Sequence, residues 1–564
     1  MAFECRQVAI LEDENRPHIE TGRDLGVPET ELVEFFMTDS ATADRPVPSI
    51  ECVTAFCPGD ALQELQHGNP SVTSESVALL DEWTHDGTES AVTCRYLRPL
   101  SARRLYLSLL EKSSIFPEGR TAGGSNGTAS QQDDQSRSRK SNRRVIFITD
   151  LNRYSTAALI STATINQARG LRESLYRHLA FRSFIGEIPP PTKFQLFQLV
   201  FDLPCYVLRT APRHRQPTDP RENGKGGPLR EVIDLSFLQR SPLSPPPTEM
   251  DYLCQAQISL LITGTHDSQW VAYFFVDTYF EDQDASESVE KYQELRGNDQ
   301  NERHVDPLTG GQSDAPIPDL TPQEYFLIVI EPRLRQCKDE WHNTVTNMRH
   351  KIESYVNLCP LTSPGLSHSP TSQDPSTVTE SRNAIIRTKR LLDQLAHVLK
   401  TTLNQWKSCN TDKMFATVPE RSPRYLPELE YHFKQLEQDL GELEFLREMC
   451  EEYKSDLSFH LKHEGRLDVK DQNRKAGFTQ VMSLVMLGLV TPIALAAAVL
   501  SMQPNAIPRP LAVNSTSFIS LAAILMLLIW ASVGATMNWE HIRGWLMVRF
   551  KEAPDDEDLE NQRG

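Results

Sequence analysis

The sequence predicts an α/β cytosolic domain, followed by long coiled-coil-like helices and a two-helix transmembrane hairpin. Three observations lead to this fold class. Strand-like and helical segments alternate through residues 1–320, a regular apolar seam runs through the helical region 321–475, and two charge-free apolar stretches follow. Each stretch exceeds the roughly 20 residues needed to cross a bilayer core. We therefore expect an integral membrane protein.

The composition places most of the chain in water. Charged residues make up 24% of the 564 residues, and the formal net charge is -18. Because nucleic acids bind basic surfaces, this balance argues against a nucleic-acid partner. An acid excess can attract cations, but it also simply keeps a large domain soluble. All 10 cysteines precede the apolar stretches and none forms a CxxC pair, so we expect reduced thiols on a cytosolic face.

The α/β domain is expected over 1–320. Runs rich in β-branched and aromatic residues predict strands at 144–149, 194–208, 256–264 and 270–279. The last two should pair across the turn Thr265–Ser268, and a helix is expected over 155–179. Polar, Pro-rich or Gly-rich segments at about 117–142, 213–247 and 282–318 are predicted to be disordered insertions.

The helical stalk is expected over 321–475, with a Pro/Ser/Thr-rich insertion at 359–376. Thr321, Pro322 and Glu324 form a capping-box pattern that marks a helix start. Further helices are expected over 378–406 and from about 427. In the last helix an apolar seam recurs at coiled-coil-like steps, through Leu429, Phe433, Leu436, Leu440, Leu443, Leu446, Met449, Tyr453, Leu457 and Leu461. We expect this seam to hold several copies of the chain together, and the helix to continue into the first membrane span.

The membrane part is expected as helix 476–503, outer loop 504–516, helix 517–539 and cytosolic tail 540–564. Basic residues flank the pair on both outer sides: Lys470, Arg474 and Lys475 before it, and Arg543, Arg549 and Lys551 after it. The positive-inside rule then places both termini in the cytosol. Early acids at the N-terminus fit neither a secretory signal nor a mitochondrial presequence. A plasma membrane or endomembrane is expected before the mitochondrial inner membrane.

Small and polar residues share one face of the first predicted span. Once Leu487 fills a gap, the stripe runs at steps of three and four through Gln480, Ser483, Leu487, Thr491, Ala494, Ala498 and Ser501. Polar groups in a membrane turn away from lipid. The stripe is therefore either a surface for close packing against another helix or the wall of a pore built from several copies. Periodicity leaves both open.

Enzyme signatures are weak. The sequence contains no GxxxxGK[ST] and no HExxH motif. Gly123–Gly127 spells GxSxG, but polar linker lies on both sides, whereas a nucleophile elbow needs a strand before it and a helix after it. We expect no enzymatic activity and no cofactor.

The end of the first span carries the most specific pattern. Pro492 is followed nine residues later by Ser501, Met502 and Gln503, and a basic, Trp-containing tail includes His541–Leu546. This region, about 426–546, resembles CorA-type magnesium transporters, in which Gly-Met-Asn stands nine residues after a mid-span proline. The arrangement of insertions is similar to that of CorA-like proteins of filamentous fungi.

The resemblance implies a homopentamer with the first span lining the pore, Pro492 as a structural residue, and Ser501, Met502 and Gln503 at the metal ion. It implies transport of a divalent cation, magnesium first. Magnesium gives up its water reluctantly, and a ring of carbonyl and amide oxygens can bind the hydrated ion. Two departures, Ser501 for Gly and a loop without acids at 504–516, argue against selective magnesium conduction. The changed motif at Ser501 and Gln503 and the long polar insertions favour the alternative of a membrane-anchored scaffold or regulator without transport, whereas the Pro492 spacing and the polar stripe favour transport.

Overall fold

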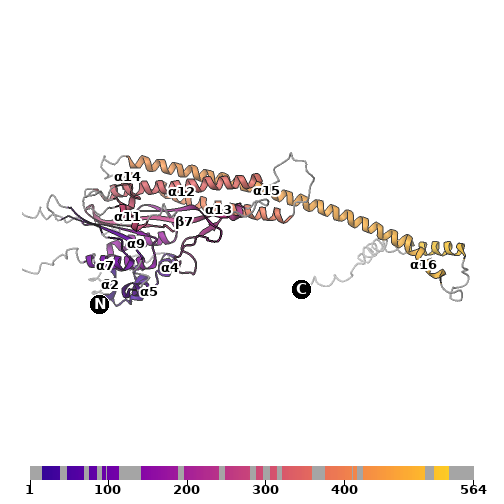
Figure 1. Ribbon diagram of the computed structural model, residues 1–564, viewed down its shortest axis with the longest axis horizontal. Helices are drawn as coiled ribbons and strands as arrows, with labels where there is room; N and C mark the ends of the chain where they lie inside the picture. Colours follow the sequence, from indigo (N-terminus) through magenta and orange to yellow (C-terminus); the bar gives the residue numbers. More distant parts are fainter. Residues whose placement is uncertain are drawn as a thin grey trace, which may run out of the picture. The chain divides into compact units, whose positions relative to one another are not determined.

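The computed structural model describes residues 16–38, 47–68, 75–85, 92–96, 98–113, 142–188, 196–239, 248–279, 288–295, 305–313, 320–358, 375–409, 411–415, 424–501 and 514–531. The chain divides into two compact units, Met1–Ser455 and Asp456–Gly564. Figure 1 shows the first as layers of helices around a sheet and the second as helices alone.

An eight-stranded sheet forms the centre of the first unit, in the order β2-β1-β3-β8-β7-β5-β4, with β6 paired to β7. The strands are β1 (Ala78–His85), β2 (Val92–Tyr96), β3 (Asn142–Thr149), β4 (Phe184–Glu187), β5 (Phe197–Pro212), β6 (Val232–Asp234), β7 (Glu249–His266) and β8 (Gln269–Val276). All described pairs are antiparallel except β3 and β8, which are parallel. The carboxyl ends of these two strands therefore meet at one edge of the sheet.

The predicted strands are found, and the expected hairpin joins β7 to β8, with His266 opposite Gln269. β5 and β7 are almost continuously buried, as expected for strands that are covered on both faces. The helix expected over 155–179 is two helices, α8 (Arg153–Thr162) and α9 (Ile165–Leu179), because the chain leaves the helical conformation at Ala163, which is extended.

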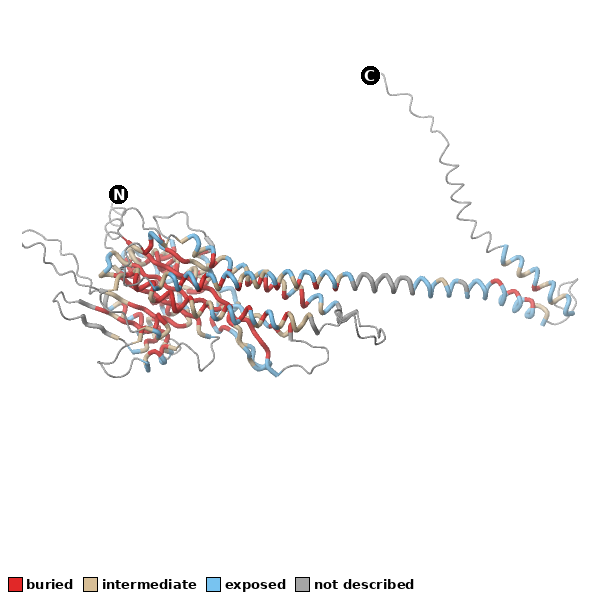
Figure 2. The backbone as a smooth tube through the Cα atoms, turned by 90° about the horizontal axis from the view of Figure 1, so that it is seen from above, coloured by how far each residue is buried: buried red, intermediate tan, exposed pale blue. Residues whose placement is uncertain are grey.

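One face of the sheet is covered by helices of the N-terminal half (Figures 1 and 2). They are α2 (His18–Leu25), η1 (Glu29–Glu31), α3 (Leu32–Met37), α4 (Val47–Phe56), α5 (Asp60–His67), α7 (Ala102–Ser113), α8 (Arg153–Thr162) and α9 (Ile165–Leu179). α9 lies close to β5 and β7 at Gly170, where a Cβ would come within 3.0 Å of Leu261 and 3.1 Å of Gln198. Glycine permits this close approach of helix and sheet.

The other face carries the long helices α12 (Pro322–Leu358), α13 (Pro375–Ser408) and the first part of α15 (Tyr425–Val485), with the short elements α10 (Ser236–Gln239), α11 (Val289–Leu295), η2 (Pro307–Thr309) and α14 (Thr411–Met414). The capping box at the start of α12 is confirmed: the Thr321 amide donates to Glu324 (2.9 Å) and the Glu324 amide donates to the Thr321 hydroxyl (3.2 Å).

The three long helices form a bundle. α12 and α15 run parallel, since His432 pairs with Glu331 (3.3 Å) and Arg349 with Glu442 (3.0 Å). α13 runs antiparallel to α15, since Lys389 pairs with Glu451 and Lys407 with Glu437.

This bundle corrects the role predicted for the apolar seam. Leu429, Leu436 and Leu443 are fully buried, and Phe433 stacks on Trp406 of α13 with ring centroids 4.4 Å apart. The buried seam residues therefore pack inside their own subunit: Leu429, Phe433, Leu436, Leu443, Leu446, Tyr453 and Leu457. Leu440 and Met449 are partly buried, and the side chain of Leu461 lies outside the described part. The pattern specifies an apolar partner helix, but not which chain supplies it.

Two predicted insertions are also corrected in the parts that the structure describes, 213–239 of the first and 288–295 and 305–313 of the second. Residues 213–239 are described, and Arg221 and Arg230 within them are buried. Within 282–318, α11 and η2 bury Tyr292 and Leu308. The polar composition of both segments predicts that they are solvated. In 213–239, however, the buried carboxylate of Asp277 binds Arg221 and Arg230. The predictions for 117–141 and 359–374 lie outside the described residues.

The second unit contains the last part of α15, a π-helical turn η4 (Met486–Val490) and α16 (Thr491–Leu500). A further helix spans Ser515–Ala531. α15 is one continuous helix, which confirms the expectation that the stalk continues into the apolar stretch.

Candidate pore-lining face

The helical segment Gln472–Leu500 is long and apolar enough to cross a membrane, with a mean hydropathy of 2.3 in its most apolar window. Only 17% of that window is buried, and side chains such as Leu489 and Leu495 are about half exposed. An apolar helix that stays exposed suits lipid better than a soluble core. The helix Ser515–Ala531 is apolar but shorter, and residues 532–539 of the second predicted span lie outside the described part.

Pro492 locally changes the helix geometry. It stands at the start of α16, directly after the π-helical turn η4. Proline has no N–H to bond the carbonyl four residues earlier, and its ring crowds that carbonyl, so a wider turn relieves the clash. The Thr491 hydroxyl donates to the Met486 carbonyl at 2.8 Å, five residues back. The wider turn therefore gives this hydroxyl a backbone partner.

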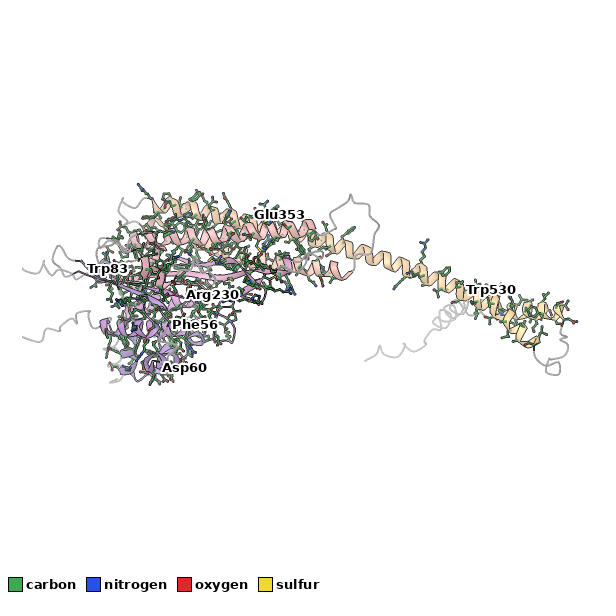
Figure 3. The ribbon with its side chains drawn as sticks, viewed as in Figure 1. Phe56, Asp60, Trp83, Arg230, Glu353 and Trp530 are labelled. Carbon is green, nitrogen blue, oxygen red and sulfur yellow. The ribbon has the colours of Figure 1, made fainter. Side chains whose placement is uncertain are left out.

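One face of this helix is buried against the second helix. Gly488, Pro492 and Ala496 are its buried residues, at steps of four. The ring of Trp530 lies against Gly488, as a Cβ there would be 3.1 Å from Cε2 and Cζ2 of the indole. Figure 3 shows Trp530 between the two helices of this unit. This row is a small-residue packing surface of the kind that lets helices approach closely.

The predicted stripe is a different face. Its described members are exposed and none belongs to the buried row: Gln480, Ser483, Leu487, Thr491, Ala494, Ala498 and Ser501. The stripe therefore does not pack against the described part of this chain's own second helix, Ser515–Ala531. Its face remains available for water, lipid or another copy.

The hydroxyls on the stripe are bonded to their own helix. Ser483 donates to the carbonyl of Thr479 and Ser501 to that of Ala498, each at 2.9 Å. A hydroxyl has one hydrogen and two lone pairs, so each oxygen still presents acceptor capacity outward. Such oxygens can accept hydrogen bonds from water around a hydrated cation.

Ser501 is the last residue described in the first span, where α16 ends. Met502 and Gln503 lie outside the described residues, so the metal-contact motif is seen only at its first position. Among the described residues, no group of three or more His, Cys, Asp or Glu side chains is arranged to hold a metal ion.

A second polar cluster lies where β3 and β8 end, and sequence reasoning missed it. Asp277 follows β8 and binds Arg221 (2.8 Å) and Arg230 (2.6 Å). Arg221 also binds Asp219 (2.8 Å). Arg230, labelled in Figure 3, is fully buried. The available signal was an aspartate directly after each of two strands, Asp150 and Asp277.

The same cluster contains a serine, a histidine and an aspartate in contact. Nδ1 of His178 lies 3.0 Å from Oγ of Ser259, and Nε2 lies 3.5 Å from Oδ1 of Asp277. A catalytic triad is recognised by such geometry, but its serine must reach a substrate. The side chains of His178 and Ser259 are completely buried in the sheet. The arrangement is therefore a structural hydrogen-bond network.

Comparison with known proteins adds little sequence evidence. No protein-family model matches the chain, and no curated protein matches it. Among solved structures, full-length CmaX is similar with a TM-score of 0.29 and 12% identity, over 83% of this chain and 98% of CmaX. The ZntB cytoplasmic domain from Vibrio parahaemolyticus RIMD 2210633 is similar with a TM-score of 0.24 and 9% identity, over 56% of this chain and 88% of that domain. Similarity this low does not establish a family, so function must rest on this chain's own residues.

Proposed function

We propose that this chain is a CorA-like membrane transporter of a divalent cation, magnesium first, in which several copies surround a pore lined by the first span. One observation carries the proposal. The stripe Gln480–Ser501 keeps its polar and small side chains exposed while a separate row, through Gly488, packs against Trp530. A polar face that no described helix of its own chain covers is costly in lipid, and a shared water-filled axis removes that cost.

The stripe suits a hydrated ion. Its hydroxyls at Ser483, Thr491 and Ser501 are satisfied as donors by their own backbone. Their oxygens are left to accept from the water shell that magnesium keeps. Ser501, Met502 and Gln503 would form the mouth, where the Gln503 amide oxygen would contact the outer waters of the ion.

The assembly proposed is a homopentamer with the second helix outside the first and both termini in the cytosol. Because the seam of α15 is buried in its own subunit, neighbouring copies must meet through other surfaces. The exposed side of α15 carries Tyr431 (57% exposed) and Phe445 (52%). These aromatic residues are a surface through which copies can associate.

Uptake by purified protein in lipid vesicles, followed with a magnesium-sensitive dye, tests the proposal. We expect saturable uptake, preserved or raised by Ser501→Gly with Gln503→Asn. Gln503→Lys should abolish it, because a fixed positive charge in a narrow pore repels divalent cations. Ser515→Lys, which adds the same charge at the start of the second helix, is the control and should leave uptake close to wild type.

Absence of uptake in the wild type and in all variants would favour the second candidate, a membrane-anchored scaffold or regulator. The observation behind that candidate is the altered motif, with Ser501 and Gln503 in place of Gly and Asn, and an outer loop without acids. Neither candidate is an enzyme.

A further inference from the structure

A line of buried polar side chains runs under α9, from the carboxyl end of β8 to the middle of β5. Asp277 contacts Nε2 of His178, and Nδ1 of that ring contacts Oγ of Ser259. Ser259 stands directly opposite Asp202 in the register of β5 and β7. His178, Ser259 and Asp202 are each fully buried. Neither carboxyl oxygen of Asp202 has a regular hydrogen-bond partner among the described residues.

The number of hydrogens on this line determines the direction of each contact. Asp277 is an anion because Arg221 and Arg230 bind both of its oxygens. Burial lowers the pKa of His178 to about 4, so the ring is neutral. Its single hydrogen must sit on Nε2 and face Asp277, since the opposite tautomer would turn a lone pair toward the anion. Nδ1 then accepts the hydrogen of Ser259.

Ser259 has given its only hydrogen to His178 and can now only accept. Gln257 is a neighbour, with Nε2 3.5 Å from the Ser259 oxygen. The two hydrogens of this amide are used, because it donates to the carbonyls of Arg177 and Arg182 at 3.1 Å each. The remaining partner is Asp202. A neutral Asp202 can donate its hydrogen to the Ser259 oxygen, which completes the chain of hydrogen bonds. An ionised Asp202 would instead place its carboxylate, an acceptor, against the Ser259 oxygen, which is also an acceptor.

We propose that Asp202 is held as a neutral carboxylic acid and that the line Asp277–His178–Ser259–Asp202 is a pH-sensitive latch, which fastens α9 to β5 and β7 in mild acid and loosens toward neutral pH. The proposal is independent of ion transport.

The charged surroundings of Asp202 agree with this assignment. Burial raises the pKa of Asp202 to about 7, and the positive charge of Arg177 only partly offsets this increase. From α9, Arg177 and Glu173 act on Asp202; β7 offers Ser259 and Gln257, and β4 places Phe184 opposite. One terminal nitrogen of Arg177 binds Glu173 (3.5 Å), and the guanidinium lies over the Phe184 ring, whose centroid is 3.9 Å away. The other terminal nitrogen has no hydrogen-bond partner among the described residues.

The sign of the pH effect follows from linkage. The pKa of Asp202 is raised from the model-peptide value of roughly 3.9 to about 7 on folding. At a pH between these two pKa values, Asp202 is protonated when α9 is packed on the sheet and ionised when it is not. Packing of α9 is therefore most favoured near the lower of the two pKa values. It weakens as the pH rises to neutrality and then becomes constant.

Hydrogen exchange of the α9 backbone amides in the full-length protein tests the latch. After correction for the intrinsic exchange rate, the equilibrium constant for opening of α9 in the wild type should increase by roughly tenfold or more between pH 5 and pH 7. Asp202→Asn keeps the shape and always donates to Ser259, so its opening should change less over this range and be rarer at pH 7. Asp393→Asn, at an exposed carboxylate on α13, is the control and should follow the wild type. Identical profiles for Asp202→Asn and the wild type would overturn the proposal.

Ser259→Ala separates the directed line from simple burial. If Asp202 donates to Ser259, the substitution removes an acceptor of the neutral acid, and the pH at which opening levels off should fall. If Ser259 instead donates to an ionised Asp202, that pH should rise, which would contradict the latch. Infrared spectroscopy gives a direct readout, since the carbonyl stretch of protonated acids at pH 6 should be weaker in Asp202→Asn than in the wild type, while Asp150 contributes to this band in both proteins. A band of equal strength in the two proteins would also overturn the assignment.

Discussion

Trp530 lies so close to Gly488 that a Cβ at residue 488 would come within 3.1 Å of its indole ring. The two apolar helices of the second unit therefore touch where the first has no side chain. This contact gives the first span two distinct faces: the row Gly488–Pro492–Ala496 is covered, and the stripe Gln480–Ser501 is not.

Filling the space at Gly488 should separate the two helices. We expect Gly488→Leu to lower the thermal stability of the detergent-solubilised protein, because overpacking a close contact costs about 1–3 kcal/mol. Gly477→Leu is the matched control, since no atom lies within 4 Å of a Cβ at Gly477 on the same helix. Equal melting temperatures for the two variants would show that the Trp530 contact does not hold the helices together.

Cysteine accessibility should distinguish the faces of the first span in membranes. We expect Ser483→Cys and Thr491→Cys to react with small hydrophilic thiol reagents, because their positions would face water. Leu489→Cys and Leu500→Cys should stay protected, because they belong to the apolar side. Modification is read by mass spectrometry at each position. Equal labelling of all four would contradict a water-lined stripe.

Assembly should depend on the exposed side of α15 and not on its seam. Phe445→Glu places a charge on an exposed aromatic position and should reduce the mass of the particle measured by light scattering in mild detergent. Leu107→Glu, at an exposed apolar side chain on α7, is the control and should leave the mass unchanged. A monomeric wild-type protein would count against a pore of any kind.

Loss of Arg230 should strongly destabilise the first unit. Arg230→Met leaves Asp277 with one arginine in a buried site, and breaking a buried ion pair costs about 3–5 kcal/mol. Arg349→Met removes an exposed, water-screened pair with Glu442 and should leave the unfolding midpoint close to that of the wild type. Denaturant unfolding measures both variants. Similar midpoints would mean that the 213–239 segment is not anchored through Arg230.

Asp150 should contribute a second pH dependence. Burial raises its pKa to about 6, despite Arg221 and the hydrogen bonds from Thr278. The stability linked to this group is therefore greatest near pH 4 and is lost as the pH rises to about 6. Asp150→Asn should remove that part of the slope in unfolding experiments between pH 4 and pH 6, and asparagine suits the positive φ of 49° at this position. An unchanged slope would contradict the raised pKa.

Local patterns in the sequence were sufficient for several features. Thr321 and Glu324 mark the start of α12 through contacts three residues apart, and the seam from Leu429 predicts a helix that buries one side. The positions of the stripe on the first span follow from helical periodicity in the same way. These features depend on residues within a few turns of one another, so composition and spacing determine them.

The tertiary structure decided which partner each pattern has. The seam packs on α12 and α13 of its own subunit, and Gly488, not the stripe, meets Trp530. Residues 213–239 are ordered because Arg221 and Arg230 reach Asp277, 56 and 47 residues further along the chain. Charge and hydropathy show that a side chain needs a partner. Which distant residue supplies it is set by how the strands and helices pack, and a one-dimensional pattern does not contain that information.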